Sequence, residues 1–468
     1  MIRFFLVLLL SSWIAEAATN TIASNSSTDW QNAINAASDG DTLIVPAGSA
    51  TWTTGVTCQK YLHILGPDAR FTTSPTAVIT INVGSGNGFQ VYNRTNGSAF
   101  IFWLKGLTFI HSSATSDIEV GSHSVAGGFR SARISDIVIT NCSSRGITTA
   151  GDLSVCIDHC WLIAPGSATL ISTDGDDDGG GSPPYNPRAW ANPFPGWGTT
   201  NGVVCENNKL SMLTTIANGA LDSYAGAITT MRFNLLTNGN IGGHGLDSSG
   251  SYRSPLAFEV YGNTNYGDAG FSKTYYNFRG GALITYSNWV FAGNASDSCQ
   301  TFIALFRTSG TNDTYPSICC SPWGSISDLL TNRYDGNQDM WSYPALDQMG
   351  YVGPTTFSST NSTQVQMPMY AWQNFMVKSG ATTDVSFFSL QVNVTNSGIY
   401  NGYDLSHIPP VTKFYIQGRD YFTNTVAPSS NYVALVYPHP FITTLEGGGG
   451  GGSSPGPSRK PTLRLRRP

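Results

Sequence analysis

Short apolar segments recur through the middle of the chain, and each is followed by an asparagine. Four of them lead into Asn208, Asn234, Asn263 and Asn288, which lie 26, 29 and 25 residues apart. A steady period of this size is typical of a solenoid, in which each coil is one supersecondary unit stacked on the last. The pattern therefore predicts an all-β fold of stacked coils.

In such a stack the four asparagines would lie above one another at a turn, each amide bonded to the next coil, so that buried polar groups are satisfied. A second column lies two positions before them. There Glu206 and Arg232 are expected to pair between adjacent coils, more as a structural pair than a catalytic one, and Tyr261 and Tyr286 to stack. The segments 137–141 and 155–158 are interpreted as earlier rungs of the same ladder.

One helix is predicted near the start of the chain. Trp30, Ala33, Ile34 and Ala37 recur at helical spacing in the segment 29–37, and Ser27 or Thr28 can cap it. Asp39-Gly40-Asp41 ends the helix, and the apolar run 42–45 is interpreted as a first strand.

Two long irregular segments interrupt the coils, at about 174–198 and 309–363. Loops of this length are usually functional or disordered. From Gly447 the chain turns glycine-rich and then basic, which is typical of a flexible tail. The predicted organisation is a signal peptide at 1–17, a β-helix domain at 18–446 with an N-terminal capping helix and long loop insertions, and a linker and tail at 447–468.

The first residues predict export. An apolar run follows Arg3, and Ala15-Glu16-Ala17 forms a small-x-small cleavage pattern before Ala18. The run is too short to span a bilayer, and no later stretch is long enough to be a transmembrane segment. Only 11% of residues are charged and the net charge is −5, which argues against a nucleic-acid partner. We expect a secreted or cell-surface protein, and several sequons permit it to be a glycoprotein without arguing for glycosylation.

The even number of cysteines, 8, suits an exported chain with disulfides, although their pairing cannot be read from sequence. Cys156 and Cys160 flank His159 and suggest a metal site. An oxidising compartment and the lack of a second matching pair favour structural cysteines.

These features resemble the right-handed parallel β-helix proteins of the pectin lyase-like superfamily. The likeness covers most of residues 20–445 and rests on the N-terminal helix with the following segment 40–48, the Asn-ended rungs and Arg279-Gly280-Gly281. The chain is also similar to secreted β-helix proteins that end in Gly-Arg-Asp-Tyr and Tyr-Pro-His-Pro, here 418–421 and 437–440. The superfamily includes lyases, hydrolases, esterases and adhesins, so the resemblance implies the fold more narrowly than the chemistry.

Within that superfamily, the segment Gly243-His244-Gly245 resembles the Gly-His-Gly element of polygalacturonase-type hydrolases. Asp222 lies 22 residues before His244 and Arg279 lies 35 residues after it, offsets that place them on neighbouring coils. Asp222 is followed by Ser223 rather than by a second Asp, and Arg279 is not followed by Lys. A tight turn is the structural alternative for this glycine-rich segment.

The resemblance implies four catalytic residues. An inverting hydrolase needs two carboxylates, one as general acid and one as base, and Asp222 and Asp247 are candidates for that pair. His244 is expected to position or tune one of them, and Arg279 to bind a substrate carboxylate. No cofactor is needed for this hydrolysis.

The competing chemistry is β-elimination from a uronate, as in pectate lyases. It needs a cation, so Asp174, Asp176, Asp177 and Asp178 are candidate Ca²⁺ ligands, with His244, Arg232 or Arg279 as base. A solvated acidic loop is the simpler interpretation of this run.

The expected partner is an extracellular, uronate-containing polysaccharide. Arg232 and Glu259 are candidate substrate-binding residues on the coils, and Trp190 and Trp197 can form a sugar-stacking platform in the first insertion. A non-catalytic glycan-binding protein, adhesin or structural β-helix remains the alternative, because low charge and a basic tail suit those classes equally.

Overall fold

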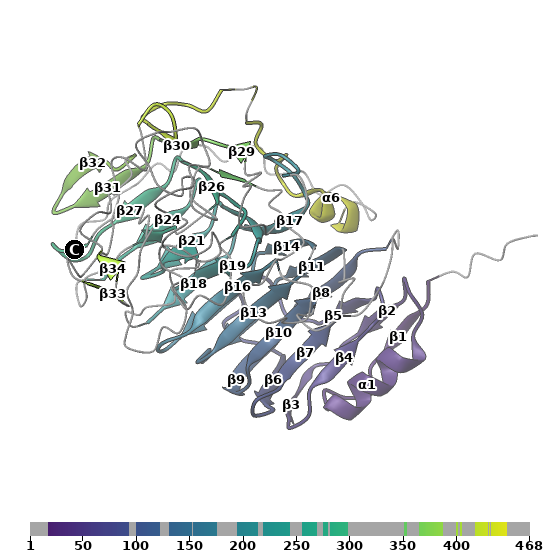
Figure 1. Ribbon diagram of the computed structural model, residues 1–468. Coiled ribbons are helices and arrows are strands. Elements are labelled where there is room, and N and C mark those ends of the chain that lie inside the picture. The colour runs from purple at the N-terminus through teal and green to yellow at the C-terminus, as the bar shows by residue number, and fades with distance from the viewer. Residues whose placement is uncertain are drawn as a thin grey trace, which may run out of the picture.

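The architecture consists of three long β-sheets whose strands stack like rungs (Figure 1). The computed structural model describes residues 17–92, 100–121, 131–151, 153–175, 194–213, 219–243, 255–268, 275–278, 281–297, 351–352, 365–386, 399–400, 403–404, 417–428, 430 and 432–446. In Figure 1 the stack begins at the purple N-terminal end, beside the first helix, and proceeds to the green strands of the C-terminal part.

The 12-stranded sheet contains β1 (Thr19–Thr21), β2 (Thr42–Ile44), β5 (His63–Leu65), β8 (Phe102–Lys105), β11 (Ser131–Ser135), β14 (Ser154–Asp158), β17 (Gly202–Glu206), β20 (Ile228–Arg232), β23 (Ala257–Tyr261), β26 (Ala282–Tyr286), β30 (Met369–Trp372) and β35 (Tyr421–Thr423). The 11-stranded sheet contains β3 (Gly48–Trp52), β6 (Ala77–Asn82), β9 (Thr108–Ser113), β12 (Val138–Thr140), β15 (Trp161–Ala164), β18 (Lys209–Met212), β21 (Leu235–Thr237), β24 (Thr264–Tyr266), β27 (Trp289–Phe291), β31 (Phe375–Lys378) and β32 (Ala381–Asp384). The 8-stranded sheet contains β4 (Val56–Cys58), β7 (Asn87–Val91), β10 (Ser116–Gly121), β13 (Arg145–Ala150), β16 (Thr169–Asp174), β19 (Leu221–Tyr224), β22 (Ile241–Gly243) and β25 (Tyr276–Asn277). Two short hairpins lie apart, formed by β28 (Tyr351–Val352) with β29 (Val365–Gln366), and by β33 (Ile399–Tyr400) with β34 (Tyr403–Asp404).

The chain visits the three sheets in rotation. From β2 onward, successive strands fall in the 12-, 11- and 8-stranded sheets in turn, and each circuit adds one strand to each sheet until β27. Neighbouring strands are parallel throughout these sheets, except for the antiparallel pair β31–β32. This arrangement confirms the all-β prediction and is consistent with a β-helix solenoid.

Helix α1 (Ser27–Ala36) confirms that a helix precedes the coils, with small differences at its ends. Its N-cap is Ser26, whose hydroxyl accepts the amide of Asp29 at 3.1 Å. Ser27 and Thr28, the predicted caps, are helical. The buried Trp30 ring packs edge-on against Trp52, with ring centroids 5.1 Å apart. The only other helix among the described residues is α6 (Pro440–Glu446).

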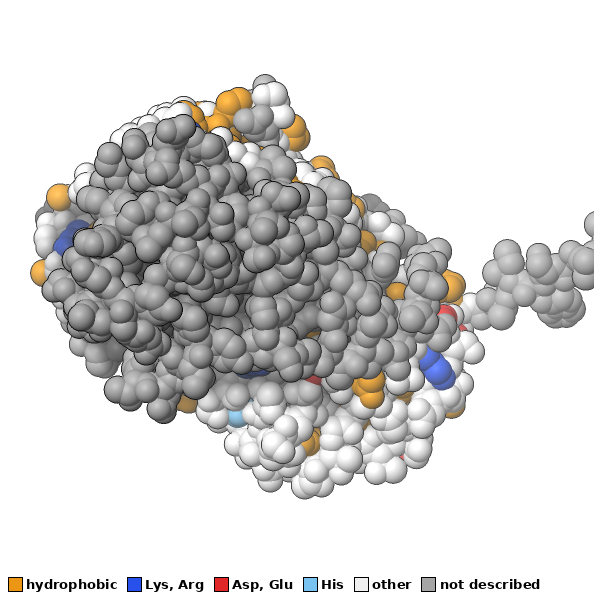
Figure 2. All heavy atoms as spheres, in the orientation of Figure 1, with side chains coloured by type: hydrophobic (Ala, Val, Ile, Leu, Met, Phe, Trp, Pro, Cys, Tyr) orange, Lys and Arg blue, Asp and Glu red, His pale blue; other side chains and the backbone are white. Residues whose placement is uncertain are grey.

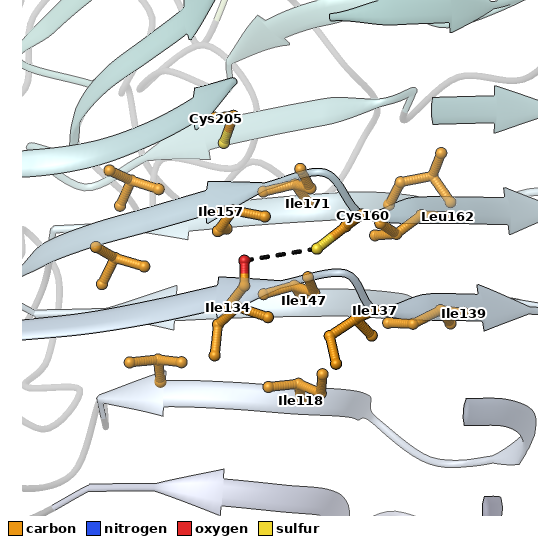
Figure 3. Close-up of a cluster of buried hydrophobic side chains, with 14 of the residues drawn as sticks. Ile118, Ile134, Ile137, Ile139, Ile147, Ile157, Cys160, Leu162, Ile171 and Cys205 are labelled. Atoms are coloured by element: carbon orange, nitrogen blue, oxygen red, sulfur yellow. Dashed lines mark hydrogen bonds between the residues drawn. The ribbon is translucent and has the colours of Figure 1, made fainter. Parts of the chain in front are cut away.

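The core fills the space between the sheets with β-branched and other apolar side chains. Figure 3 shows Ile134 and Ile157 from the 12-stranded sheet facing Ile147 and Ile171 from the 8-stranded sheet. All four are fully buried. Because side chains alternate along a strand, burying one face leaves the other set directed outward, and parallel register aligns that outer set into columns.

The cysteines correct the disulfide prediction. Within the described part of the chain, five cysteines are present, all are buried (Cys58, Cys142, Cys156, Cys160 and Cys205), and no disulfide joins any two of them. Cys160 Sγ lies 3.6 Å from the carbonyl oxygen of Ile134 in the core (Figure 3). Burial raises the pKa of the Cys160 thiol well above its usual value. These thiols therefore act as small apolar side chains, while Cys299, Cys319 and Cys320 lie outside the described residues.

The asparagine ladder is confirmed in detail. The Asn208 side-chain amide donates to Asn234 Oδ1 at 3.0 Å, and the same contact recurs from Asn234 to Asn263 and from Asn263 to Asn288. Asn288 continues it to Asn374 at 2.8 Å, a rung that the period did not reveal because 86 residues separate the two. Each amide also donates to a backbone carbonyl of the preceding coil, such as Asn234 Nδ2 to Cys205 at 2.9 Å.

From β8 onward, a left-handed residue precedes the ladder position in each coil. It occupies the turn between the 12- and 11-stranded sheets, where φ lies between 53° and 70° at Gly106, Asp136, His159, Asn207, Phe233, Gly262, Ser287 and Gln373. A single left-handed residue reverses the chain direction sharply, at a cost for residues other than Gly, Asn and Asp. The following side chain, which is the ladder asparagine in the later coils, then points into the core.

Two earlier rungs were expected, and one is misplaced. The segment 155–158 lies in β14 of the 12-stranded sheet, as predicted. The segment 137–141 instead contributes β12 to the 11-stranded sheet, and the rung of its coil in the 12-stranded sheet is β11. Asn141 is exposed and does not belong to the ladder, although it resembles a ladder residue in sequence.

We expect Asn234→Ala to lower the free energy of unfolding by about 2–4 kcal/mol, because it leaves the backbone N–H of Asn208 and the carbonyl of Cys205 buried without their partner. Chemical denaturation monitored by circular dichroism measures the loss. Thr382→Ala on the exposed strand β32 is the control and should change stability by less than about 0.5 kcal/mol. Equal effects of the two substitutions would contradict a stabilising ladder.

Candidate functional site

The outer face of the 8-stranded sheet carries a continuous polar column. Its register aligns Thr57, Gln90, Glu119, Thr148, Ser172, Asp222, Gly242 and Asn277 on successive strands. The residues that precede them, such as Ile147, Ile171 and Leu221, point into the core. The polar side chains of this outer column are not needed to fill the core. This face is therefore a candidate ligand site.

Two carboxylates and a phenol lie toward the ends of β16 and β19 on this face, and Arg145 begins the neighbouring strand β13. Asp174 ends β16 directly opposite Tyr224 on β19, and Asp222 lies two residues before Tyr224 on the same face. Burial raises the pKa of the Tyr224 hydroxyl, the charges of Asp174 and Asp222 raise it further, and the charge of Arg145 lowers it. The side chains of Asp174, Asp222 and Arg145 therefore each lie within electrostatic reach of Tyr224.

The spacing of the two carboxylates follows from sheet geometry. Adjacent strands lie about 4.8 Å apart, and residues two positions apart along a strand are separated by roughly 6.6 Å. Asp174 and Asp222 are diagonal neighbours in this register, so their Cα atoms are separated by roughly 8 Å. Asp174 is buried, whereas Asp222 remains partly exposed to solvent.

At the other end of the face, uncharged amide and hydroxyl side chains form hydrogen bonds near a third carboxylate, Glu119. Glu119 Oε2 accepts Gln90 Nε2 at 2.7 Å and is also in contact with Asn87 Nδ2. Ser116 and Thr148 share a hydroxyl hydrogen bond of 2.7 Å between adjacent coils. Amides and hydroxyls of this kind are the groups that recognise sugar hydroxyls.

Three of the four expected catalytic residues, His244, Asp247 and Arg279, lie outside the described residues, as do Trp190 and the expected calcium ligands Asp176, Asp177 and Asp178. Strand β22 ends at Gly243, and a side chain at Gly243 would come within 2.5 Å of the carbonyl oxygen of Ser223. The close approach of two coils thus accounts for this glycine. Across the described ranges, no group of three or more His, Cys, Asp or Glu side chains is arranged to hold a metal ion.

Arg232 lies on a different face from Asp222, the outer face of the 12-stranded sheet, and is fully buried there. Its Nε donates to Glu206 Oε2 at 2.7 Å, which confirms the predicted pair. Its two terminal nitrogens donate to the carbonyl oxygens of Leu435 at 2.6 Å and Val436 at 2.9 Å. One guanidinium therefore joins two coils to a segment about 200 residues further along the chain.

That segment, residues 432–446, crosses the outer face of the 12-stranded sheet, and we call it the C-terminal strap. In Figure 1 it is the yellow chain that descends to α6 beside β11, β14 and β17. The His439 amide donates to Glu206 Oε1 at 3.1 Å, and Glu446 accepts Arg133 at 2.8 Å, while Arg133 also binds Asp158 at 2.7 Å. The strap thus covers a row of buried ion pairs.

The strap buries one side and exposes the other. Val433 and Val436 are 70% and 63% exposed. Hydrophobic side chains, orange in Figure 2, gather along the upper margin of the molecule, where the strap runs in Figure 1. The Tyr437 ring packs against Phe233 with centroids 4.8 Å apart. This explains the position of the Tyr-Pro-His-Pro motif, which lies in the middle of the strap.

Glu259 and Trp197 meet under the upper part of the strap. Glu259 Oε1 accepts the amide of Gly198 at 2.7 Å, and the Trp197 ring lies 6.4 Å from that of Tyr432. The predicted stack of Tyr261 on Tyr286 is present, at 4.7 Å, and it continues onto Trp372. Burial raises the pKa of Glu259 to about 7, although the Gly198 amide, Tyr432 and Arg232 favour its ionised form.

Comparisons with known proteins add no family: no family model, no curated protein and no solved structure matches the chain. No helix in the described ranges is long and apolar enough to cross a membrane.

Sequence reasoning missed Arg145, Tyr224 and the strap. Arg145 and Tyr224 belong to the 8-stranded sheet, whose strands lack a recurring terminal residue comparable to the ladder asparagine. The sequence carries a weak signal for the strap. It has charged residues, Glu206 and Arg232, in a column of the coil, and a Pro-rich segment late in the chain, but no local pattern joins residues so far apart.

Glu259→Gln should stabilise the protein at pH 8 and have little effect near pH 4. The folded-state pKa of Glu259 is raised to about 7, so its contribution to stability is present below its unfolded value of 4.5 and is lost as the pH rises through 7. The expected gain at pH 8 is at most about 3 kcal/mol. Thermal unfolding of both proteins across pH 4–8 measures it.

His439 titrates in the opposite sense, since burial lowers its pKa to about 4 and its contribution is lost as the pH falls. Comparing variant and parent at each pH cancels that effect. Parallel stability curves for the two proteins would contradict a raised pKa at Glu259.

Proposed function

We propose that the protein is a secreted carbohydrate-active enzyme that cleaves a uronate-containing polysaccharide on the outer face of the 8-stranded sheet. The observation that supports this best is the grouping of Asp174, Asp222 and Arg145 around Tyr224 on one polar face. Ionisable groups of both signs close to a carboxylate that is open to solvent are typical of a ligand site. The neutral network at Glu119 extends the same face and suits binding of further sugar units.

Hydrolysis is the chemistry that the described residues support best. An inverting mechanism needs carboxyl groups roughly 6.5–9.5 Å apart, which the diagonal placement of Asp174 and Asp222 allows. In this proposal, enclosed Asp174 donates the proton to the leaving oxygen, and Asp222, which is open to solvent, activates the water. Arg145 binds a uronate carboxylate through its planar fork. The site also adjoins β22 and β25 in the sheet order, the strands after which His244, Asp247 and Arg279 follow in sequence.

The finer structural assignments belong to the same proposal. We infer a right-handed coil, because parallel crossover connections almost always have that hand. We also infer that α1 closes the first coil and that the protein is related to the pectin lyase-like superfamily. Arg232 and Glu259 are assigned to holding the strap rather than to the substrate, because both are buried beneath it.

The first test is incubation of the mature protein with pectic, alginate-like and neutral polysaccharides, with and without Ca²⁺. New reducing ends without ultraviolet absorbance are expected, which identifies hydrolysis. Reducing ends with absorbance that depends on Ca²⁺ would replace hydrolysis by β-elimination, with Asp174 and residues 176–178 as candidate metal ligands. Glycan retained on the protein without cleavage would favour the binding or adhesin class.

Asp222→Asn and Asp174→Asn should each lower kcat on the cleaved polysaccharide by about 10²-fold or more, since each removes one proton-transfer group. Asp384→Asn is the control, because it neutralises an exposed carboxylate of the 11-stranded sheet. Full activity in either site variant would remove that residue from the mechanism. An equal loss in the control would indicate damage to the fold.

A further inference from the structure

Ala18, at the start of the described chain, contacts the nearly buried carboxylate of Asp41. The backbone nitrogen of Ala18 donates to Asp41 Oδ1 at 2.7 Å, and the other oxygen, Oδ2, accepts the amide of Ser38 at 2.7 Å. Asp41 is 7% exposed, whereas Ala17 and Ala18 are exposed. Asp41 thus presents one oxygen to the peptide nitrogen at the position where the sequence predicts cleavage.

Cleavage would change the partner of Asp41 from an amide to an ammonium. Hydrolysis of the Ala17–Ala18 bond by a signal peptidase consumes one water, leaves a carboxylate on Ala17 and transfers the protons to the new amine of Ala18. That amine is charged below its ordinary pKa of about 7.7–8.0. The bond to the Asp41 carboxylate, which is already charge-assisted when its donor is an amide, then becomes an ion pair as well.

We propose that Asp41 is the receptor for the mature N-terminus, and that removal of residues 1–17 locks the first strand onto the coil through an Ala18 ammonium–Asp41 carboxylate pair. The pair acts at the edge of the 12-stranded sheet. Ala18 also accepts the amide of Thr42 at 2.7 Å, and β1 pairs in parallel with β2 through Thr19 and Thr42. An anchored Ala18 therefore holds the whole of β1, whose three residues are exposed and which, among the described strands, pairs with β2 alone.

This proposal is independent of the glycan function and uses the cleavage site predicted from Ala15-Glu16-Ala17. Its first test is the intact mass and N-terminal sequence of the protein secreted from a eukaryotic host. A mature chain that begins at Ala18 is expected. A chain that begins elsewhere overturns the proposal.

The second test separates the charge from the fold. Two forms are compared at pH 6.5, one beginning at Ala18 and one with Gly-Ser before Ala18, both released from a removable fusion partner. Hydrogen exchange of the amides at residues 42–44 is expected to be roughly tenfold slower in the form that begins at Ala18. Asp41→Asn should abolish most of that difference, because it removes the charged acceptor.

Asp39→Asn provides the matched control, since Asp39 lies two residues away and accepts the amide of Tyr61 at 2.9 Å. It should alter exchange equally in the two forms. If Asp41→Asn also has the same effect in both forms, Asp41 serves only Ser38 and a neutral amide, and the proposal is wrong. This result would leave polysaccharide cleavage unaffected, so the two proposals fail separately.

Discussion

The turn between the 12- and 11-stranded sheets is the constraint on which the structure depends. Each coil must reverse direction there while its backbone groups are buried between neighbouring coils. One left-handed residue makes the reversal, and the next residue satisfies the buried groups, by an asparagine amide in the later coils. Because each amide bonds to the coils on both sides of its own, the turn fixes the register of adjacent coils. A shift by one residue would direct the core side chains outward.

Fixed register has a functional consequence, since it aligns outward side chains into columns from residues that are far apart in sequence. The aligned columns differ between the outer faces of the 12-stranded and 8-stranded sheets. On the 12-stranded sheet the column of Asp158, Glu206 and Arg232 is buried beneath the strap, where its charges are paired with one another or with strap groups. On the 8-stranded sheet the column is polar, and at Asp222 it stays open to solvent. The contrast explains why the ionisable residues of the first face hold the fold together while those of the second suit a ligand.

The sequence predicted the features that are local or periodic. The asparagine spacing revealed the coil, the stacked tyrosines and the Glu206–Arg232 pair, and the helical spacing at Trp30 located α1 to within two residues. It did not locate β11, whose turn residue Asp136 is followed by Ile137 instead of asparagine. It carried only a weak signal for the strap, because Arg232 and Leu435 are brought together only by the fold. The cysteine count suggested disulfides, but no disulfide joins any two of the five described thiols, and all five are buried.

The central claim is that glycan occupies the outer face of the 8-stranded sheet, and bound-state hydrogen exchange tests it most directly. The protein is saturated with a defined oligouronate, under conditions that prevent turnover, and exchange is mapped over all three sheets. The account predicts slower exchange in peptides that cover β13, β16 and β19, with β20 and the strap unchanged. Protection confined to the strap and the 12-stranded sheet, or to the 11-stranded sheet, would contradict it.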